Sequence, residues 1–219
     1  MDSIIAVNKP KGPTSHDIVA RIRKLTGVKK VGHAGTLDPL ASGVLVIGIG
    51  RDATKKLGVI VNTEKEYRAV IELGAISKTD DSEGPIISRN VRARPDKEEI
   101  CKILTSFEGR TKQLPPVYSA LHINGARAYR LARGNKEVIL SSREIEIKKI
   151  EIISYTWPKL EIKVVTGPGV YIRALARDIG ERLSTGGYLK SLERTRVGRY
   201  DIEKSIKIED IKHYEKTIL

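Results

Sequence analysis

The segment Gly32–Gly43, with the sequence GHAGTLDPLASG, constrains this chain more than any other stretch, because the apolar run Val44–Ile49 follows it directly. Its glycines permit tight turns or the close approach of a ligand. Asp38 precedes Pro39, so its backbone is biased toward extended conformations and away from a helix interior. A carboxylate on a stiff loop before a buried strand is where a nucleophile or general base would be placed. The alternative is an aspartate that only caps a turn.

The charge of the chain indicates the class of its partner. Its 219 residues include 40 Lys and Arg against 27 Asp and Glu, which gives a net charge of +13 and a pI near 9.8. This excess fits a polyanion, with nucleic acid ahead of a membrane surface. Charge supplies affinity rather than chemistry, and a lysine-rich protein that binds no polyanion is the alternative.

Several other classes of site are missing from the sequence. No apolar run approaches the ~20 residues of a membrane helix, and the N-terminus has no secretory signal. The single cysteine, Cys101, excludes an internal disulfide and suits a reducing compartment. The 4 scattered histidines lack metal-site spacing, and there is no Walker phosphate loop. The sequence therefore predicts a cytoplasmic protein without a metal site or a membrane partner.

Hydrophobic periodicity predicts both helices and strands. Helical spacing covers Ile18–Leu25, Thr54–Val61, Ile100–Phe107 and Ile172–Leu183. Strands are predicted over Ile4–Val7, Val44–Ile49, Tyr67–Leu73, Ile145–Ile152 and Leu160–Val164. The last two form a hairpin, and a slip in phase at Lys148–Lys149 suggests a bulge. Consecutive hairpin strands favour antiparallel pairing and an α+β architecture.

The first predicted helix has recognisable ends. Thr14, with Asp17 three residues later, resembles a capping box, and Gly27 ends the element. The outer face of this helix and the residues after it carry a basic cluster, consisting of Arg21, Arg23, Lys24, Lys29 and Lys30. The cluster is a candidate nucleic-acid footprint, and a solvated helix face is the alternative.

Two further side chains need partners that the local pattern does not supply. Tyr67 falls on the core-facing side of its predicted strand, where packing is the default role and the hydroxyl needs a hydrogen-bond partner. Arg173 falls near the first turn of its predicted helix, where the helix dipole disfavours a cation. This position indicates a carboxylate or phosphate partner, unless the side chain faces solvent.

Residues 110–138 differ from the rest of the chain in composition. Pro115–Pro116 interrupt a segment in which basic side chains are interleaved with Tyr118 and Tyr129. Such an irregular excursion suits looped RNA, with charge against phosphates and rings against unstacked bases. An ordinary surface insertion is the alternative. The earlier segment 77–85, SKTDDSEGP, is predicted to be an acidic polar loop.

A dinucleotide-binding site is a second hypothesis. Residues 48–53, GIGRDA, match G-x-G-x-x-A between a predicted strand and a predicted helix, with Glu72 at a suitable distance. A charged Arg-Asp pair stands where phosphates would approach, and no repeated alternation of strands and helices follows. Both features weigh against this hypothesis.

Ordered blocks along the chain carry a resemblance to a known family. These blocks are Asn8–Gly12 (NKPKG), Gly32–Gly43, Glu66–Arg68 (EYR), Pro115–Leu121 (PPVYSAL), Gly169–Arg173 (GVYIR) and Leu189–Val197. They resemble the tRNA pseudouridine synthase B (TruB) family, and several blocks in order are far more specific than one motif. The resemblance implies the pseudouridine synthase fold, a mixed, largely antiparallel central sheet flanked by helices. It also implies that 110–138 is a loop that clamps RNA.

The resemblance implies site residues as well. Asp38 corresponds to the catalytic aspartate, Tyr67 to the ring stacked on the flipped uracil, and Arg173 to the salt-bridge partner of Asp38. The substrate-binding residues carried over are His33 against the displaced RNA stem, Tyr171 and Leu192 in the uridine pocket, and Lys9 and Lys55. The resemblance implies no metal site.

The implied activity is that of an isomerase, a tRNA pseudouridine(55) synthase that acts without a cofactor on the TΨC stem-loop of tRNA, as a monomer. The predicted organisation is a catalytic domain over residues 1–204 and a short tail over 205–219. It includes no PUA domain, the C-terminal RNA-binding domain that bacterial members usually carry. Two alternatives are a guide-RNA-dependent rRNA pseudouridine synthase and a non-catalytic RNA-binding or chaperone protein.

Overall fold

The computed structural model describes residues 2–118, 122–123, 126–127 and 140–211. The chain forms two compact units. The first unit comprises Met1–Arg68, Val165–Pro168 and Leu192–Leu219, and the second unit comprises Ala69–Val164 and Gly169–Ser191. Within the described residues, no helix has both the length and the apolar character needed to cross a membrane.

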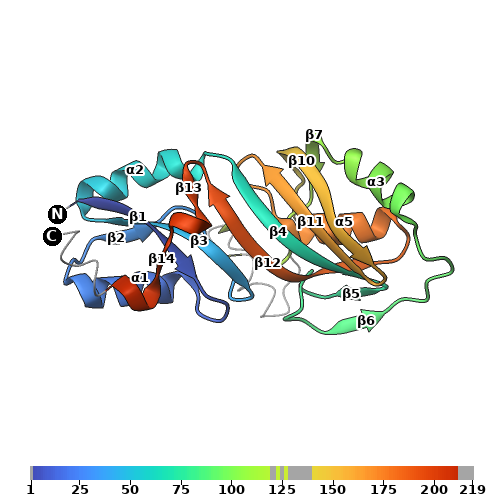
Figure 1. Ribbon diagram of the computed structural model, residues 1–219, viewed down its shortest axis with the longest axis horizontal. Helices are drawn as coiled ribbons and strands as arrows, with labels where there is room; N and C mark the ends of the chain where they lie inside the picture. The colour runs from blue at the N-terminus through green and yellow to red at the C-terminus, as the bar shows by residue number, and fades with distance from the viewer. Residues whose placement is uncertain (1, 119–121, 124–125, 128–139, 212–219) are drawn as a thin grey trace. The chain divides into compact units, whose positions relative to one another are not determined.

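The main sheet is mixed and largely antiparallel (Figure 1). Its strands follow the order β14-β1-β3-β12-β4-β11-β10-β7, with β2 paired to β3 and β13 paired to β12. Their bounds are β1 Ser3–Lys9, β2 Val31–His33, β3 Ala41–Ile49, β4 Lys65–Leu73, β7 Gly109–Gln113, β10 Arg143–Thr156, β11 Lys159–Thr166, β12 Gly187–Val197, β13 Tyr200–Asp201 and β14 Ile206–Lys207. The pairs β1–β3, β2–β3, β7–β10 and β12–β13 are antiparallel, whereas β1–β14 and β3–β12 are parallel.

Helices and two short hairpins complete the fold, which confirms the predicted α+β class. The helices are α1 Ser15–Thr26, α2 Arg51–Val61, α3 Lys97–Thr105 and α5 Ile172–Arg182, with 3-10 turns at Ile202–Lys204 and Ile208–Asp210. The hairpins pair β5 (Ala75–Ser77) with β6 (Ile86–Ser88), and β8 (His122–Ile123) with β9 (Ala126–Arg127). All four predicted helices are therefore present.

Alternation along β1 and β3 gives the first unit two apolar layers. The layer against α1 includes Val7, Leu45, Ile47 and Ile49 with Ile18, Val19, Ile22 and Val31. The layer against α2 consists of Ala34, Val44, Val46, Val197 and Leu57. Figure 1 shows α1 and α2 on opposite sides of these strands. Because both faces of β3 are covered, all of Val44–Ile49 is buried, which explains its unbroken apolar sequence.

The ends of α1 match the prediction. The Thr14 hydroxyl accepts from the Asp17 amide at 3.1 Å, and the Asp17 carboxylate accepts from the Thr14 amide at 2.8 Å, which completes the capping box. Gly27 closes the helix in the left-handed conformation, with φ 67°. The local signals of this segment were sufficient because capping involves only neighbouring residues.

Part of the predicted tail, residues 205–219, belongs to the core of the first unit. β14 pairs in parallel with β1. Ile208 and Ile211 are buried in the layer against α1. Residues 212–219 lie outside the described residues.

The second unit is built around the β10–β11 strands and the helices α3 and α5. Along β10, Ile145 and Ile147 are buried and then Ile150, so the burial pattern shifts phase at the predicted Lys148–Lys149 slip. The alternating prediction for β4 is also confirmed. Of the predicted RNA loop 110–138, residues 119–121, 124–125 and 128–138 lie outside the described residues.

The dinucleotide hypothesis fails at the helix that would bind the phosphates. The backbone N–H groups of Asp52 and Ala53 donate to Asp2 Oδ1, at 2.8 and 3.2 Å, so a carboxylate of the chain itself holds the N-terminus of α2. These bonds lower the pKa of Asp2. In addition, β1 and β2 flank β3 in antiparallel orientation, unlike the parallel strands of a dinucleotide-binding unit.

Candidate active site

Asp38 lies in the loop between β2 and β3 of the first unit, and the residues on either side of it are hydrogen-bonded to Gly12 and to Ser15, the first residue of α1. The Ser15 hydroxyl donates to the Leu37 carbonyl oxygen at 3.0 Å and accepts from the Leu37 amide at 2.9 Å. The Gly12 amide donates to the Pro39 carbonyl oxygen at 2.8 Å. The half-buried Asp38 is thus held in a fixed loop, as the Asp-Pro sequence predicted.

Arg194 of β12 connects this loop to Tyr67. Its Nε donates to the Val44 carbonyl oxygen at 2.8 Å and its Nη2 to the Gly35 carbonyl oxygen at 3.1 Å. The guanidinium also forms a hydrogen bond with the Tyr67 hydroxyl. Burial lowers the pKa of Arg194, and Tyr67 opposes that shift. The Tyr67 side chain is buried, and Arg194 is the hydroxyl partner that its position requires.

Gly43 shows why this loop is rich in glycine. Its φ is +102°, and a Cβ there would lie 2.3 Å from the Arg194 carbonyl oxygen. The close approach is therefore between β3 and β12, rather than between the loop and a ligand. In the parallel pairing of β3 with β12, the predicted pocket residue Leu192 lies opposite Ala41, which is the third residue after Asp38.

Lys65 is a buried cation beside the same site. Its ammonium donates to the carbonyl oxygens of Val61 and Thr63. Burial, reinforced by the nearby charge of Arg194, lowers the pKa of Lys65 to about 8. The folded protein therefore releases this proton at a lower pH than the unfolded chain does.

We expect the stability contributed at Lys65 to rise with pH. Between pH 8 and 10.5 the unfolded chain binds more protons at this residue, so the free energy of unfolding increases by up to about 3 kcal/mol across that window. Urea unfolding at several pH values, as the difference between wild type and Lys65→Met, measures this change. The exposed Lys56→Met serves as the control. A pH-independent difference would contradict the assignment.

His33, a predicted RNA contact, ends β2 and meets the ring of His16 edge-to-face, with ring centroids 5.5 Å apart. Burial lowers the pKa of His33 below 6.5, and the nearby His16 and Arg194 lower it further. The imidazole is therefore neutral at neutral pH. Contact of His33 with RNA stays a prediction.

The two predicted lysines differ in environment. Lys9 is fully buried, at 0% exposure, and its ammonium donates to the carbonyl oxygens of Pro10 and Pro13 at 2.9 and 2.8 Å. Lys55 lies on the surface of α2 and pairs with Asp52 at 2.8 Å. Lys9 therefore braces the turn before α1. Substrate binding by either lysine stays a prediction.

Arg173 lies in the second unit, in the first turn of α5. Its Nη1 is 3.3 Å from Asp81 Oδ2, and both side chains are buried. The guanidinium also donates to the carbonyl oxygens of Thr79 at 3.2 Å and Tyr118 at 3.0 Å. The sequence prediction of a carboxylate partner for Arg173 is confirmed, and this partner comes from the acidic loop 77–85.

A second ion pair fastens the same loop to the next turn of α5. Arg177 Nη1 lies 2.8 Å from Asp80 Oδ2, and its Nη2 lies 2.8 Å from Asp178 Oδ1. Burial raises the pKa of Asp80, and Arg177 opposes that shift. Asp80 has a φ of +61°, which is costly for a residue other than glycine. The two ion pairs therefore stabilise a loop conformation that the backbone of Asp80 alone would disfavour.

Tyr171, a predicted pocket residue, forms the N-cap of α5. The buried Gln113 side chain accepts from the Tyr171 amide at 2.9 Å and donates to the Tyr171 carbonyl oxygen at 3.1 Å. The Arg143 guanidinium stands 4.5 Å from the centroid of the Tyr171 ring. The start of α5, and with it Arg173, is thereby anchored to β7 and β10.

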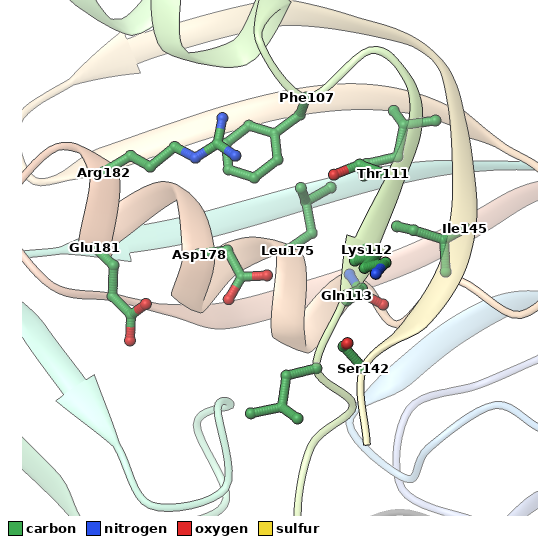
Figure 2. Close-up of a pocket in the computed structure, with 12 residues that line it drawn as sticks. Phe107, Thr111, Lys112, Gln113, Ser142, Ile145, Leu175, Asp178, Glu181 and Arg182 are labelled. Atoms are coloured by element: carbon green, nitrogen blue, oxygen red, sulfur yellow. The ribbon is translucent and has the colours of Figure 1, made fainter. Parts of the chain in front are cut away.

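A cavity of about 340 Å³ lies beside these elements in the second unit. Figure 2 shows Leu175, Asp178 and Glu181 of α5 facing the same space as Lys112 and Gln113 of β7. The Arg182 guanidinium lies over the Phe107 ring, 4.0 Å from its centroid. None of the predicted site residues, all of which are described, lines this cavity.

The predicted residues divide between the two units. Asp38, Tyr67, His33, Leu192, Lys9 and Lys55 belong to the first unit, and Arg173 and Tyr171 to the second. The salt bridge of Asp38 with Arg173 stays a prediction. Sequence reasoning missed the residues that hold these groups, namely Ser15, Asp81, Gln113 and Arg194. Of these four residues, only Asp81 could have been suggested by the sequence. It lies in an acidic loop of a basic chain, and Arg173 was expected to have a carboxylate or phosphate partner.

Two protein-family models match this chain. Residues 23–172 match the TruB family pseudouridylate synthase (N terminal domain), and residues 173–217 match the tRNA pseudouridylate synthase B C-terminal domain. The two matches together span residues 23–217, which include parts of both units.

Individual relatives agree with these matches. The tRNA pseudouridine synthase B of Clostridium tetani is 44% identical over 211 residues, which cover 96% of this chain and 73% of the relative. That of Thermobifida fusca is 41% identical over 218 residues, with 96% and 74% covered. A chain in the crystal structure of a Cbf5–Nop10–Gar1 complex superimposes with a TM-score of 0.75 at 30% identity over 96% of this chain, which spans 54% of that one. The chain belongs to the TruB family of pseudouridylate synthases.

Proposed function

We propose that this protein isomerises uridine to pseudouridine at position 55, in the TΨC loop of tRNA. The reaction breaks the N1–C1′ bond of the nucleotide, turns the uracil and rejoins it to the sugar through C5. The observation that carries the proposal is the link between Asp38 and Tyr67. The buried guanidinium of Arg194 holds both the loop of Asp38, through Gly35, and the hydroxyl of Tyr67.

The proposed roles follow from the chemistry of each side chain. A uridine in a loop must first leave its stack, which costs a few kcal/mol that stacking on a ring such as Tyr67 offsets. The Asp38 carboxylate then acts on the reacting nucleotide. A guanidinium favours the ionised form of a neighbouring carboxylate, and we assign this role to Arg173.

We assign the remaining predicted residues to substrate binding. Leu192 and Tyr171 offer apolar surface to the uridine, and the neutral His33 offers a hydrogen bond or a ring to the displaced stem. The surface cation Lys55 suits a phosphate. For the buried Lys9 we propose an indirect role, through the turn that leads to the Gly12–Pro39 hydrogen bond.

Release of hydrogen from C5 tests the proposal, because rejoining through C5 displaces the hydrogen atom on that carbon. Incubating the protein alone with tRNA transcript tritiated at uridine C5 is expected to release tritium to water. A transcript with cytidine at position 55 should release none. Release only after addition of a guide RNA would support the guide-dependent alternative. Binding without any release would support the RNA-chaperone alternative.

We expect Tyr67→Ala to reduce the rate of the bound complex more than the affinity for tRNA. Loss of one base–ring stack corresponds to about 10- to 100-fold in the single-turnover rate, because the flipped base is bound mainly after extrusion. Filter binding should change less than about threefold, since most affinity comes from phosphate contacts. Tyr67→Phe keeps the ring and removes the bond to Arg194, so it separates the two roles. A larger effect on affinity than on rate would make Tyr67 a scaffold residue.

A further inference from the structure

Ser15 holds the residue that precedes Asp38 by both of its backbone polar groups. Its hydroxyl accepts from the Leu37 amide at 2.9 Å and donates to the Leu37 carbonyl oxygen at 3.0 Å. Ser15 is 1% exposed and Leu37 is 3% exposed, so water does not compete for these bonds. The contact joins residues 22 positions apart in the sequence.

The Ser15 hydroxyl bonds both backbone polar groups of Leu37, as a neighbouring strand would in a sheet. A residue in a sheet has its amide and carbonyl groups held by a ladder, whereas Leu37 lies in the loop between β2 and β3. Pro39 has no amide hydrogen, so the chain after Asp38 has one donor fewer with which to fix itself. The Gly12 amide holds the Pro39 carbonyl oxygen, at 2.8 Å. The peptide group before Asp38 and the carbonyl oxygen of Pro39 are therefore held by the segment Gly12–Ser15, whereas the Asp38 carbonyl oxygen accepts from the Ala41 amide at 3.1 Å.

The rigidity of that segment comes from α1. Ser15 is the first residue of the helix, and Thr14 and Asp17 cap the same end with reciprocal hydrogen bonds. Ile18 and Ile22 bury the helix against β1 and β3. The Ser15 hydroxyl therefore attaches the loop that carries Asp38 to a helix that is itself packed against the sheet.

We infer that Ser15 is a positioning residue for Asp38, which sets the direction of its carboxylate by fixing the Leu37 peptide groups. The inference rests on the proposed function. At 1% exposure the Ser15 side chain cannot contact RNA, so its effect on the reaction passes through the loop. A misplacement of about 1 Å at a reacting group costs on the order of 100-fold in rate. Loss of the two hydrogen bonds should therefore affect the chemical step and leave binding unchanged.

The test compares Ser15→Ala, Ser15→Thr and Thr185→Val. Thr185 is the matched control, since it is also 1% exposed and its hydroxyl donates to a backbone carbonyl oxygen, that of Gly186 at 2.8 Å. Each protein is assayed for the single-turnover rate of tritium release, for tRNA affinity by filter binding, for melting temperature and for hydrogen exchange at the Leu37 amide.

Ser15→Ala is expected to slow the single-turnover rate about 10- to 100-fold with affinity within about twofold of wild type. The Leu37 amide should exchange faster. Ser15→Thr, which keeps the hydroxyl, should recover most of the rate. Thr185→Val should lower the melting temperature without slowing the reaction. Should Ser15→Ala fail to fold, Ser15→Cys keeps the size and weakens the hydrogen bonds, and it is expected to show the same loss of rate.

Two results would overturn the inference. One is a rate for Ser15→Ala, or for Ser15→Cys in its place, within about threefold of wild type while the Leu37 amide has lost its protection. The other is a loss of affinity that accounts for the whole loss of activity. Both leave the proposed function intact, because wild type still releases tritium. Absence of release by wild type would instead contradict the proposed function itself.

Discussion

Replacement of Asp38 by asparagine is expected to abolish pseudouridine formation and to leave tRNA binding intact. Asparagine has the size of aspartate but neither its charge nor its nucleophilicity, so the loop held by Ser15 and Gly12 should keep its shape. Removing an essential reactive group lowers turnover by at least about 10³-fold. Single-turnover tritium release at saturating protein measures the rate, and filter binding measures the affinity.

Asp52→Asn is a matched control for the Asp38 experiment. Asp52 is an exposed carboxylate of the same unit, paired with Lys55 on the surface of α2. Its replacement should leave the rate of the bound complex unchanged. Near wild-type turnover of Asp38→Asn would mean that Asp38 only caps a turn and takes no part in the reaction.

Removal of Asp81 is expected to cause the largest loss of stability. The carboxylate of Asp81 stands 3.3 Å from the Arg173 guanidinium, with the side chains 3% and 8% exposed. Removing one partner of a buried ion pair costs about 3 kcal/mol, because the buried Arg173 guanidinium loses a compensating carboxylate. Urea unfolding of Asp81→Ala measures this loss. Turnover should fall as well, since Asp81 also anchors the loop beside the first turn of α5.

Two comparisons sharpen this prediction. Asp81→Ala combined with Arg173→Met removes both charges, so it should regain much of the stability but none of the activity. Glu151→Ala breaks an exposed ion pair of the same unit, with Lys149 at 2.6 Å, and should scarcely change the unfolding midpoint. An Asp81→Ala midpoint equal to that of wild type would mean that the Arg173 charge is compensated elsewhere.

Local patterns predicted those parts of the fold that neighbouring residues determine. The capping box at Thr14, the alternation along β4 and the phase slip in β10 were all readable because they involve residues within one element. The apolar run Val44–Ile49 correctly indicated a buried strand, and the structure covers it on both faces. Arg173 is the one case in which a local conflict, a cation at a helix start, correctly indicated a distant carboxylate.

The contacts that position the site were not readable from the sequence. The Ser15 hydroxyl and the Arg194 guanidinium bind backbone atoms, and backbone atoms carry no sequence signal. The close approach of Gly43 to the backbone of Arg194 left no local signal either, because the two residues are far apart in the sequence. The packing of Ile208 and Ile211 against α1 depends on chain ends meeting in space, which no periodicity predicts.

Mapping pseudouridine at single-nucleotide resolution is the most direct test of the proposed reaction. An unmodified tRNA transcript is incubated with the protein alone, treated with a carbodiimide that marks pseudouridine, and read by reverse transcription. We expect one new stop, which marks pseudouridine at position 55 in the TΨC loop, with wild type and none with Asp38→Asn. Absence of any stop, stops scattered over other uridines, or an equal stop with Asp38→Asn would contradict the proposed reaction and its assignment to Asp38.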